Sequence, residues 1–154
     1  MARDPNVRIM LDSETYNNSK NFLREIKGHI ESERFQSIWG NWVGPVWNEA
    51  EIVIDTRTKV LKESTLFISA VESSRVGSHC EVIVMDDLCS EANMLTEEVR
   101  NKVISHYRMN TAILEPHGTM VVVGTRYHSD DVIGHILRSE IDESVLKDLG
   151  LADY

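Results

Sequence analysis

The run Val-Ile-Val-Met-Asp-Asp at residues 82–87 decides how the chain can fold. Four consecutive apolar side chains leave no polar face, so the run fits a strand that is covered on both sides. Strands of this kind are typical of parallel sheets with helices on both faces. The two acids that follow mark the carboxyl end of the strand. We therefore expect a central strand of an α/β sheet over residues 82–85.

The chain on both sides of this run alternates between strand and helix patterns. A second apolar run, Met120–Val123, ends in Gly124-Thr125 and predicts another covered strand. The remaining patterns predict strands at 7–11, 51–57 and 65–71, and helices at about 18–33, from Thr96 onward and after a cap at Ser129. This order predicts a three-layer α/β fold, with a mostly parallel sheet between flanking helices.

Length and composition indicate one ordinary globular domain. The 154 residues are 42% hydrophobic and 27% charged, which supplies a core and excludes a disordered chain. The net charge of −9 makes the chain a poor general binder of nucleic acid, and its acidic end, residues 127–154, is the part least suited to face DNA. Cys80 and Cys89 form no disulfide framework, and Cys80 is expected in the core. No stretch approaches the ~20 apolar residues of a membrane span, so we expect a cytosolic protein.

All three tryptophans fall within residues 35–50, together with Gly40, Gly44 and Pro45. Glycine and proline interrupt regular structure, so this segment is predicted to be a loop. The tryptophan rings either cover the edge of the core or form an exposed contact surface. The sequence leaves both interpretations open.

Asp86 and Asp87 stand where chemistry is expected, because the sites of open α/β sheets lie at the carboxyl ends of central strands. Four apolar residues followed by two acids form a Walker B pattern. In that pattern the first carboxylate serves Mg²⁺ and the second orients a water molecule toward a γ-phosphate. The same pattern also arises where a strand simply ends in solvent.

The second strand end carries the segment GTRYHSDDVIG, residues 124–134. An arginine buried at a strand tip needs an anionic partner. Arg126 therefore either faces a bound anion or pairs locally with Asp130 or Asp131. Thr125 is correspondingly either a functional residue or part of a turn.

Together, these segments resemble the ATPase domain of phage terminase large subunits, the motors that package DNA. The resemblance rests on SSRVGSHCEVIVMDDL at 73–88 and GTMVVVGTRYHSDDVIGHIL at 118–137, and it extends over residues 6–138. It implies a P-loop NTPase-like fold with ATP and Mg²⁺ as cofactors. It also implies a homo-oligomeric ring in the host cytoplasm that drives double-stranded DNA into the procapsid, with the portal protein and the small terminase subunit as partners. Residues 139–154 form an acidic C-terminal segment beyond the resemblance.

The resemblance also implies roles for individual residues. Asp86 matches the Walker B aspartate that serves Mg²⁺, and Asp87 matches the catalytic carboxylate, where many family members have glutamate. Thr125 falls in the coupling motif that senses the nucleotide state, with Arg126 beside it as a nucleotide-binding residue. Arg75 falls near the position of the arginine finger that acts on the neighbouring subunit.

The sequence contains no G-x-x-x-x-G-K-[ST] motif, whose backbone amides and lysine hold the β- and γ-phosphates. By the resemblance, that loop would precede the first strand, and a nuclease domain would follow the last helix. We therefore expect residues 1–154 to be a single, partial motor domain, from a truncated or split protein. We expect this chain to bind ATP poorly by itself.

Two other functions fit the same residues. A metal-dependent nuclease or hydrolase would use Asp86 and Asp87 with His79 or His128, and with Asp55 from a neighbouring strand. The sequence has no CxxC or HExxH spacing, so a zinc site is not expected. A non-catalytic interaction domain would keep the motor fold without its activity.

Overall fold

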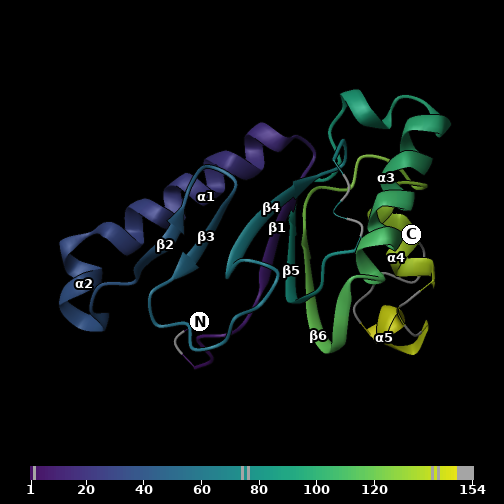
Figure 1. The fold of residues 1–154 in the computed structure, drawn as a ribbon. Helices are drawn as coiled ribbons and strands as arrows, with labels where there is room; N and C mark the ends of the chain where they lie inside the picture. The colour runs from purple at the N-terminus through teal and green to yellow at the C-terminus, as the bar shows by residue number, and fades with distance from the viewer. Residues whose placement is uncertain (2, 74, 76, 140, 142, 149–154) are drawn as a thin grey trace.

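The computed structural model describes residues 1, 3–73, 75, 77–139, 141 and 143–148. Within these residues the chain forms, in order, β1 (Ile9–Ser13), α1 (Tyr16–Glu31), α2 (Glu33–Trp39), β2 (Val43–Trp47), β3 (Glu51–Ile54), β4 (Leu66–Ala70), β5 (Cys80–Asp86), the short 3₁₀ helix η1 (Ala92–Met94), α3 (Glu97–Thr111), β6 (Leu114–Val123), α4 (Val132–Ser139) and α5 (Glu143–Asp148) (Figure 1).

The described part of the chain contains one six-stranded mixed sheet in the order β2-β3-β4-β1-β5-β6. β1 pairs in parallel with β4 and β5, and β5 pairs in parallel with β6. β2 and β3 add antiparallel pairs beyond β4. The predicted α/β class with a mostly parallel sheet is therefore confirmed, and β5 lies between two neighbours, as its apolar run predicts.

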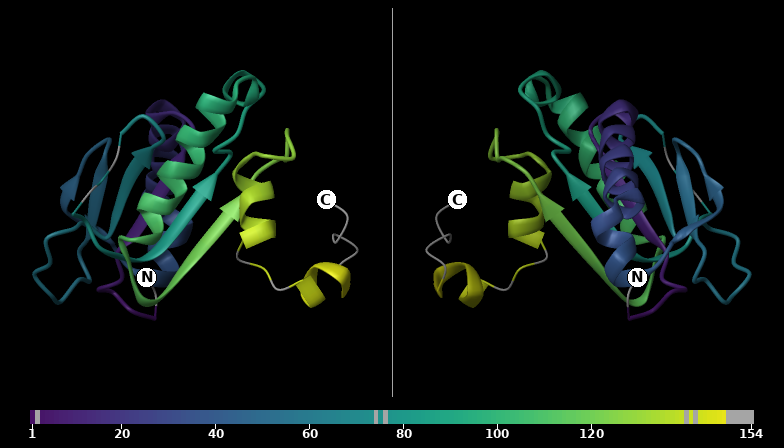
Figure 2. Two further views of the ribbon diagram at one scale, coloured as in Figure 1. Left: turned by 90° about the vertical axis from the view of Figure 1, so that its right-hand side faces the viewer. Right: turned by 90° about the vertical axis from the view of Figure 1, so that its left-hand side faces the viewer.

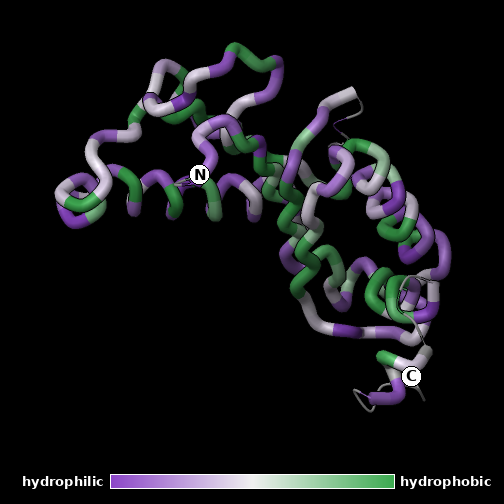
Figure 3. The backbone as a smooth tube through the Cα atoms, turned by 90° about the horizontal axis from the view of Figure 1, so that it is seen from below, coloured by the Kyte–Doolittle hydropathy of each residue, from purple (hydrophilic) through white to green (hydrophobic). Residues whose placement is uncertain are grey.

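Helices cover the two faces of this sheet, and each face has its own cluster of buried side chains. On one face, Leu23 of α1 packs with Ile68 of β4 in a cluster that we call the α1-side core; the cluster on the other face is the α3-side core. On the other face Val103 of α3 packs with Ile83 of β5, and α4 contributes Val132. Figure 3 shows the hydrophobic stretches of the chain gathered where the strands run.

Polar caps set the starts of the long helices. The Thr15 hydroxyl accepts a hydrogen bond from the Asn18 N–H at 3.2 Å, so α1 begins at Tyr16, two residues before the predicted start. The Thr96 hydroxyl accepts from the Val99 N–H at 3.3 Å, with Glu97 and Glu98 in the first turn. The predicted cap of the second long helix is therefore confirmed.

The prediction of a loop over residues 35–50 is wrong. The helix α2 ends at the left-handed Gly40, and the edge strand β2 follows with Gly44 and Pro45 inside it. Proline is tolerated there because β2 has a partner on one side only within the described chain. A Cβ at Gly44 would lie 2.0 Å from the Val53 carbonyl oxygen, so glycine allows the two strands to approach.

The tryptophans divide between the two interpretations that the sequence left open. Trp42 is buried in the α1-side core and packs edge-on against Phe35, with the ring centroids 5.1 Å apart. Trp39 is 54% exposed at the end of α2. Trp47 lies between these extremes and stacks under the Lys27 ammonium group.

The strand β6 is not covered on both faces as its apolar run predicts. It is the last strand of the described sheet, and Val121 and Val123 are 40% and 53% exposed. Met120 and Val122, on its other face, pack against the α3-side core. The face of β6 that looks toward the α1 side of the sheet is therefore open.

Cys80 lies in the core as predicted, and burial raises the pKa of its thiol to about 12. The helix α5 stands apart from the sheet in both views of Figure 2. It covers part of the acidic segment predicted at 139–154, of which residues 140, 142 and 149–154 lie outside the described residues.

Candidate functional site

The parallel register brings Asp86 of β5 between Ser13 of β1 and Val123 of β6. All three residues are the last of their strands, so they share the carboxyl edge of the sheet, which is at the top in Figure 1. This is the edge where α/β sheets hold ligands. The structure therefore brings together the two strand ends that the sequence singled out.

Asp86 projects from the α1 side of the sheet. Side chains alternate along a strand, and Val84, two residues earlier, packs on the α1-side core. Asp86 is partly buried, and this burial, followed by the negative charge of Asp87, raises the pKa of its carboxyl group. Within the described chain no group donates a hydrogen bond to Asp86. A carboxylate in this setting gains from a bound cation.

Asp87 leaves the strand in a different direction. Its φ of 47° is left-handed, a conformation that aspartate adopts more readily than most residues. Its backbone N–H still donates to the Val123 carbonyl at 3.0 Å, which ties it to the end of β6. A Cβ at Gly124 would lie 3.5 Å from Asp87 Oδ1, so the carboxylate faces the start of the next loop. The two carboxylates therefore point in different directions: Asp86 projects from the α1 side of the sheet, and Asp87 faces Gly124.

The loop after β6 is organised by Asp131, which is fully buried. Its Oδ2 accepts from the N–H groups of Tyr127 at 2.9 Å and His128 at 3.1 Å, and its Oδ1 accepts from the Gly134 N–H at 2.8 Å. The predicted cap at Ser129 is thus wrong: Asp131 caps α4, because a carboxylate can accept from the loop and the helix at once.

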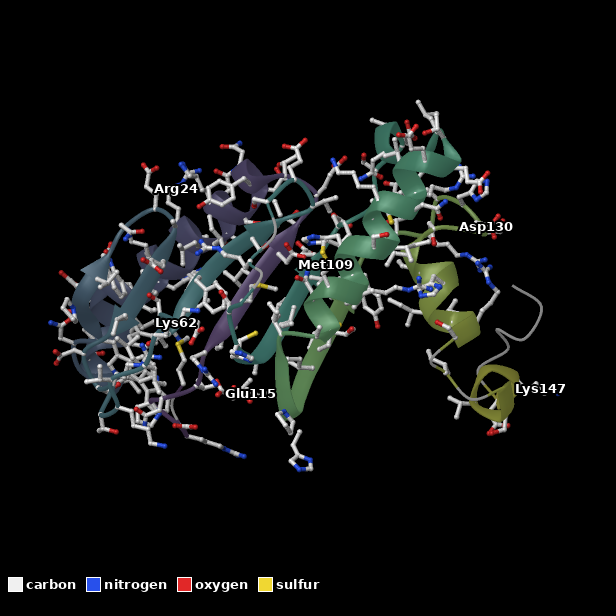
Figure 4. All side chains as sticks on the ribbon, turned by 45° about the vertical axis from the view of Figure 1, so that its right-hand side comes forward. Arg24, Lys62, Met109, Glu115, Asp130 and Lys147 are labelled. Carbon is white, nitrogen blue, oxygen red and sulfur yellow. The ribbon has the colours of Figure 1, made fainter. Side chains whose placement is uncertain are left out.

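The other predicted residues of this loop lie near its surface. Thr125 is exposed, directly after Gly124. The Arg126 guanidinium donates to the Ser129 carbonyl at 3.4 Å. Asp130 pairs with Arg138 of α4 at 3.2 Å, and Figure 4 shows it beside the helices α3 and α4, at the right of the view. Thr125 and Arg126 therefore follow the same strand end that touches Asp87.

Arg75 lies elsewhere. Its Nε donates to the Ile68 carbonyl at 3.0 Å, and its guanidinium group stacks on the Phe67 ring at 5.7 Å. With Asn110 and Ile113 it lines a hollow of about 360 Å³ between the loop before β5 and the end of α3. The structure thus does not bring Arg75 to Asp87 of the same chain.

A buried polar cluster beside the site was missed from the sequence. Asp12 Oδ2 accepts from His106 Nε2 at 2.7 Å and from Asn110 Nδ2 at 2.8 Å, and all three residues are at most 2% exposed. The cluster joins β1 to α3 one residue before Ser13. The available signal was the pair of polar residues at 106 and 110, four apart on the apolar side of α3.

The residues of the hydrolase hypothesis are spread over both edges of the sheet. Asp55 follows β3, which runs antiparallel to β4, so it lies at the amino edge, away from Asp86. His79 precedes β5 at that same edge, and its N–H donates to Glu63 at 3.1 Å. Among the described residues no group of three or more His, Cys, Asp or Glu side chains is arranged to hold a metal ion.

The amino edge instead carries an ion-pair cluster centred on Arg8. Its guanidinium group binds Glu63 at 3.1 Å and Glu115 at 2.9 Å, and it also pairs with Glu81. These partners, Glu81 first, raise the pKa of Arg8 above its usual range. Figure 4 shows Glu115 at the lower end of β6, opposite the Asp130 loop. This cluster is a structural feature, separate from the carboxyl edge.

Comparison of the chain with models of known protein families and with curated proteins finds no match. No helix in the described part of the chain has the length and apolar character needed to cross a membrane.

Proposed function

We propose that this chain is part of the ATPase motor of a phage terminase large subunit, which drives double-stranded DNA into the procapsid. The observation that carries the proposal is the pair Asp86–Asp87 at the carboxyl end of β5, with the two carboxylates pointing to different places. The α/β sheet and the resemblance of residues 6–138 to the terminase ATPase domain support it.

The two acids would have separate roles in ATP hydrolysis, one in binding Mg²⁺ and one in orienting water. Asp86 is partly buried, has no hydrogen-bond donor within the described chain, and would hold Mg²⁺. Bound Mg²⁺ neutralises phosphate charge as it develops during phosphoryl transfer. Asp87 is exposed and faces Gly124, so its carboxylate would orient the attacking water. Thr125, the next residue after Gly124, would respond to the nucleotide and pass the change to the loop held by Asp131.

The proposal requires a phosphate-binding loop from outside residues 1–154, because this sequence has no P-loop motif. The chain by itself should therefore hydrolyse ATP at a negligible rate. Arg75 would act on a neighbouring subunit of a ring, and its position away from Asp87 of its own chain fits that role. The DNA, the portal protein and the small terminase subunit are the partners that belong to this proposal.

The test uses a protein in which this chain is joined to the terminase segment that carries the phosphate-binding loop. We expect Asp86→Asn to weaken Mg²⁺-dependent ATP binding. We expect Asp87→Asn to leave binding near normal and to slow single-turnover hydrolysis by about 10²–10⁴-fold, the usual contribution of a positioned carboxylate. Asp55→Asn, an exposed acid at the opposite edge, is the matched control. Hydrolysis within a few fold of the parent protein in Asp87→Asn would overturn the assignment.

A non-catalytic interaction domain is the second candidate, and the exposure of Val121 and Val123 on the edge strand β6 favours it. That function predicts no effect of nucleotide on the joined protein, with or without Mg²⁺. The same titration therefore separates the two candidates.

A further inference from the structure

Ser13 carries a buried hydroxyl that has no hydrogen-bond partner among the described residues. The predicted strand ends at residue 11, but β1 continues through Ser13. Its side chain is 1% exposed, and its Oγ makes no hydrogen bond within the described chain. A hydroxyl has one donor and two acceptor sites, so burying it unbonded loses its interactions with water. The structure around it therefore lacks a group that would satisfy it.

The missing group would lie toward Asp86. Ser13 and Asp86 are register partners on adjacent parallel strands, and their side chains project from the same face of the sheet. Adjacent strands lie about 4.8 Å apart, which brings the two side chains side by side. They do not hydrogen-bond each other, and no described group donates to Asp86. On the other side of Asp86 stands Val123, which is apolar and 53% exposed.

A divalent cation satisfies both residues at once. Adjacent ligands of an octahedral Mg²⁺, with bonds of about 2.0–2.1 Å, have their oxygens about 3 Å apart, a separation open to side chains on neighbouring strands. A hydroxyl and a carboxylate are hard oxygen ligands, which suit Mg²⁺ or Mn²⁺. The cysteine nearest in sequence, Cys89, packs in the core of the opposite face.

We propose that Ser13 Oγ is the second protein ligand, with Asp86, of a divalent cation at the carboxyl edge of the sheet. The inference deepens the proposed function, on which the role of Asp86 rests, by adding a ligand from β1. Two protein oxygens leave most of the coordination shell to water or phosphate, so the free cation binds weakly to the chain alone. Ser13 would also fix the ion on the α1 side, away from the loop that Asp87 faces.

The first experiment uses Mn²⁺ as the probe, with the 154-residue chain as it stands. Substoichiometric Mn²⁺ should broaden the backbone NMR signals of residues 13, 14, 86 and 87, and excess Mg²⁺ should reverse the broadening. Asp86→Asn should abolish this local broadening. Ser13→Ala should weaken it by about threefold or more, because one of two protein ligands is lost.

The second experiment replaces the hydroxyl with a thiol. In Ser13→Cys the site gains a soft ligand, so Cd²⁺ should bind about tenfold or more tightly than to the parent chain. The gain should vanish in the double variant Ser13→Cys/Asp86→Asn. Ser64→Cys is the matched control: Ser64 is also buried beside a carboxylate, but its hydroxyl already donates to Glu51 at 2.9 Å, at the other edge of the sheet.

The outcomes separate this inference from the proposed function. If Mn²⁺ broadening at Asp86 is unchanged in Ser13→Ala, and Ser13→Cys gains no more Cd²⁺ affinity than Ser64→Cys, Ser13 is not a ligand and at most holds a water molecule. The proposed function would survive that result. Absence of Mn²⁺ broadening at residues 86 and 87 in the parent chain would overturn the cation site itself, and the ATP hydrolysis assay would then decide the function separately.

Discussion

Replacing Asp12 with alanine would remove the carboxylate that joins β1 to α3. That carboxylate accepts hydrogen bonds from His106 at 2.7 Å and from Asn110 at 2.8 Å. Both donors are at most 2% exposed, so after the substitution water could not replace the lost acceptor without opening the core. The variant therefore leaves His106 and Asn110 buried without this acceptor, with their mutual contact of 3.1 Å between Asn110 Nδ2 and His106 Nε2.

The size of the loss follows from this geometry. A hydrogen bond to a charged group contributes about 1.5–3 kcal/mol, and Asp12 accepts two of them. Because two such hydrogen bonds are lost, we expect Asp12→Ala to lower the free energy of unfolding by about 3–5 kcal/mol, a large part of the ~5–15 kcal/mol that a domain of this kind has. His106→Ala should also destabilise the chain, because it removes one of the two donors to the buried carboxylate and leaves Asn110 at 2.8 Å.

Urea denaturation of the two single variants and of Asp12→Ala/His106→Ala gives the coupling between them. Each single variant leaves the other residue of the pair buried without their shared hydrogen bond. The loss of stability in the double variant should therefore be smaller than the sum of the two single losses by about 2 kcal/mol. His29→Ala is the control, since His29 approaches Glu25 at 3.8 Å while both side chains are mostly exposed. That change should alter stability by less than about 0.5 kcal/mol.

Two results would refute this reasoning. A loss below about 1 kcal/mol in Asp12→Ala would mean that the donors find other partners. Additive effects in the double variant, within about 0.5 kcal/mol, would mean that the two residues act independently. Hydrogen exchange gives a further readout, because the amides of α3 should lose protection in Asp12→Ala before those of α1.

Two further predictions test the helix packing and the amino edge. Gly134→Ala should destabilise the chain by more than about 1 kcal/mol, because its Cβ would lie 2.1 Å from the Ser129 carbonyl oxygen. Gly28→Ala in α1 should instead stabilise the chain by about 0.5–1 kcal/mol, because a Cβ there would have nothing within 4 Å. Thermal unfolding of both variants checks the pair, and equal shifts in the unfolding temperature would contradict the prediction. Arg8→Met should destabilise the chain at pH 7, and the penalty should shrink below pH 4.5, the ordinary value for glutamate. Burial by itself would raise the pKa of Glu63 and Glu81, but hydrogen bonds from Arg8 and from backbone N–H groups hold both pKa values low, so their contribution is present above the unfolded-state pKa and is lost as the pH falls through the folded-state values. A penalty that stays constant from pH 7 to pH 3 would show that Arg8 acts through packing rather than through charge.

The sequence predicted those parts of the fold whose signals are local. The apolar run at 82–85 indicates a covered strand from consecutive residues alone. Thr96, followed by two acids, likewise indicates the start of a helix. The predicted class of the sheet followed from the order of these elements. The patterns that indicate covered strands and capped helices lie in consecutive residues, so the sequence alone predicts these elements.

The errors arose where distant partners override local signals. Gly44 and Pro45 indicate a loop, but they lie in β2 because Val53 of the next strand pairs with that segment. The predicted strand ends at residue 11, because Asp12 begins a run of mostly polar residues. The acceptor role of Asp12 depends on His106, 94 positions away, which no short pattern reveals.

The candidate site shows the same division. Asp86 and Asp87 were found because the pattern that marks them lies within six residues, 82–87. Ser13 was not found, since its relation to Asp86 exists only through the register of β1 against β5. A shift of that register by one residue would turn Ser13 to the opposite face and leave Asp86 beside Asp12 or Glu14. Such a shift would also move Leu11 and Met10 out of their core clusters. The packing of these two apolar side chains therefore fixes which polar residue of β1 stands beside Asp86.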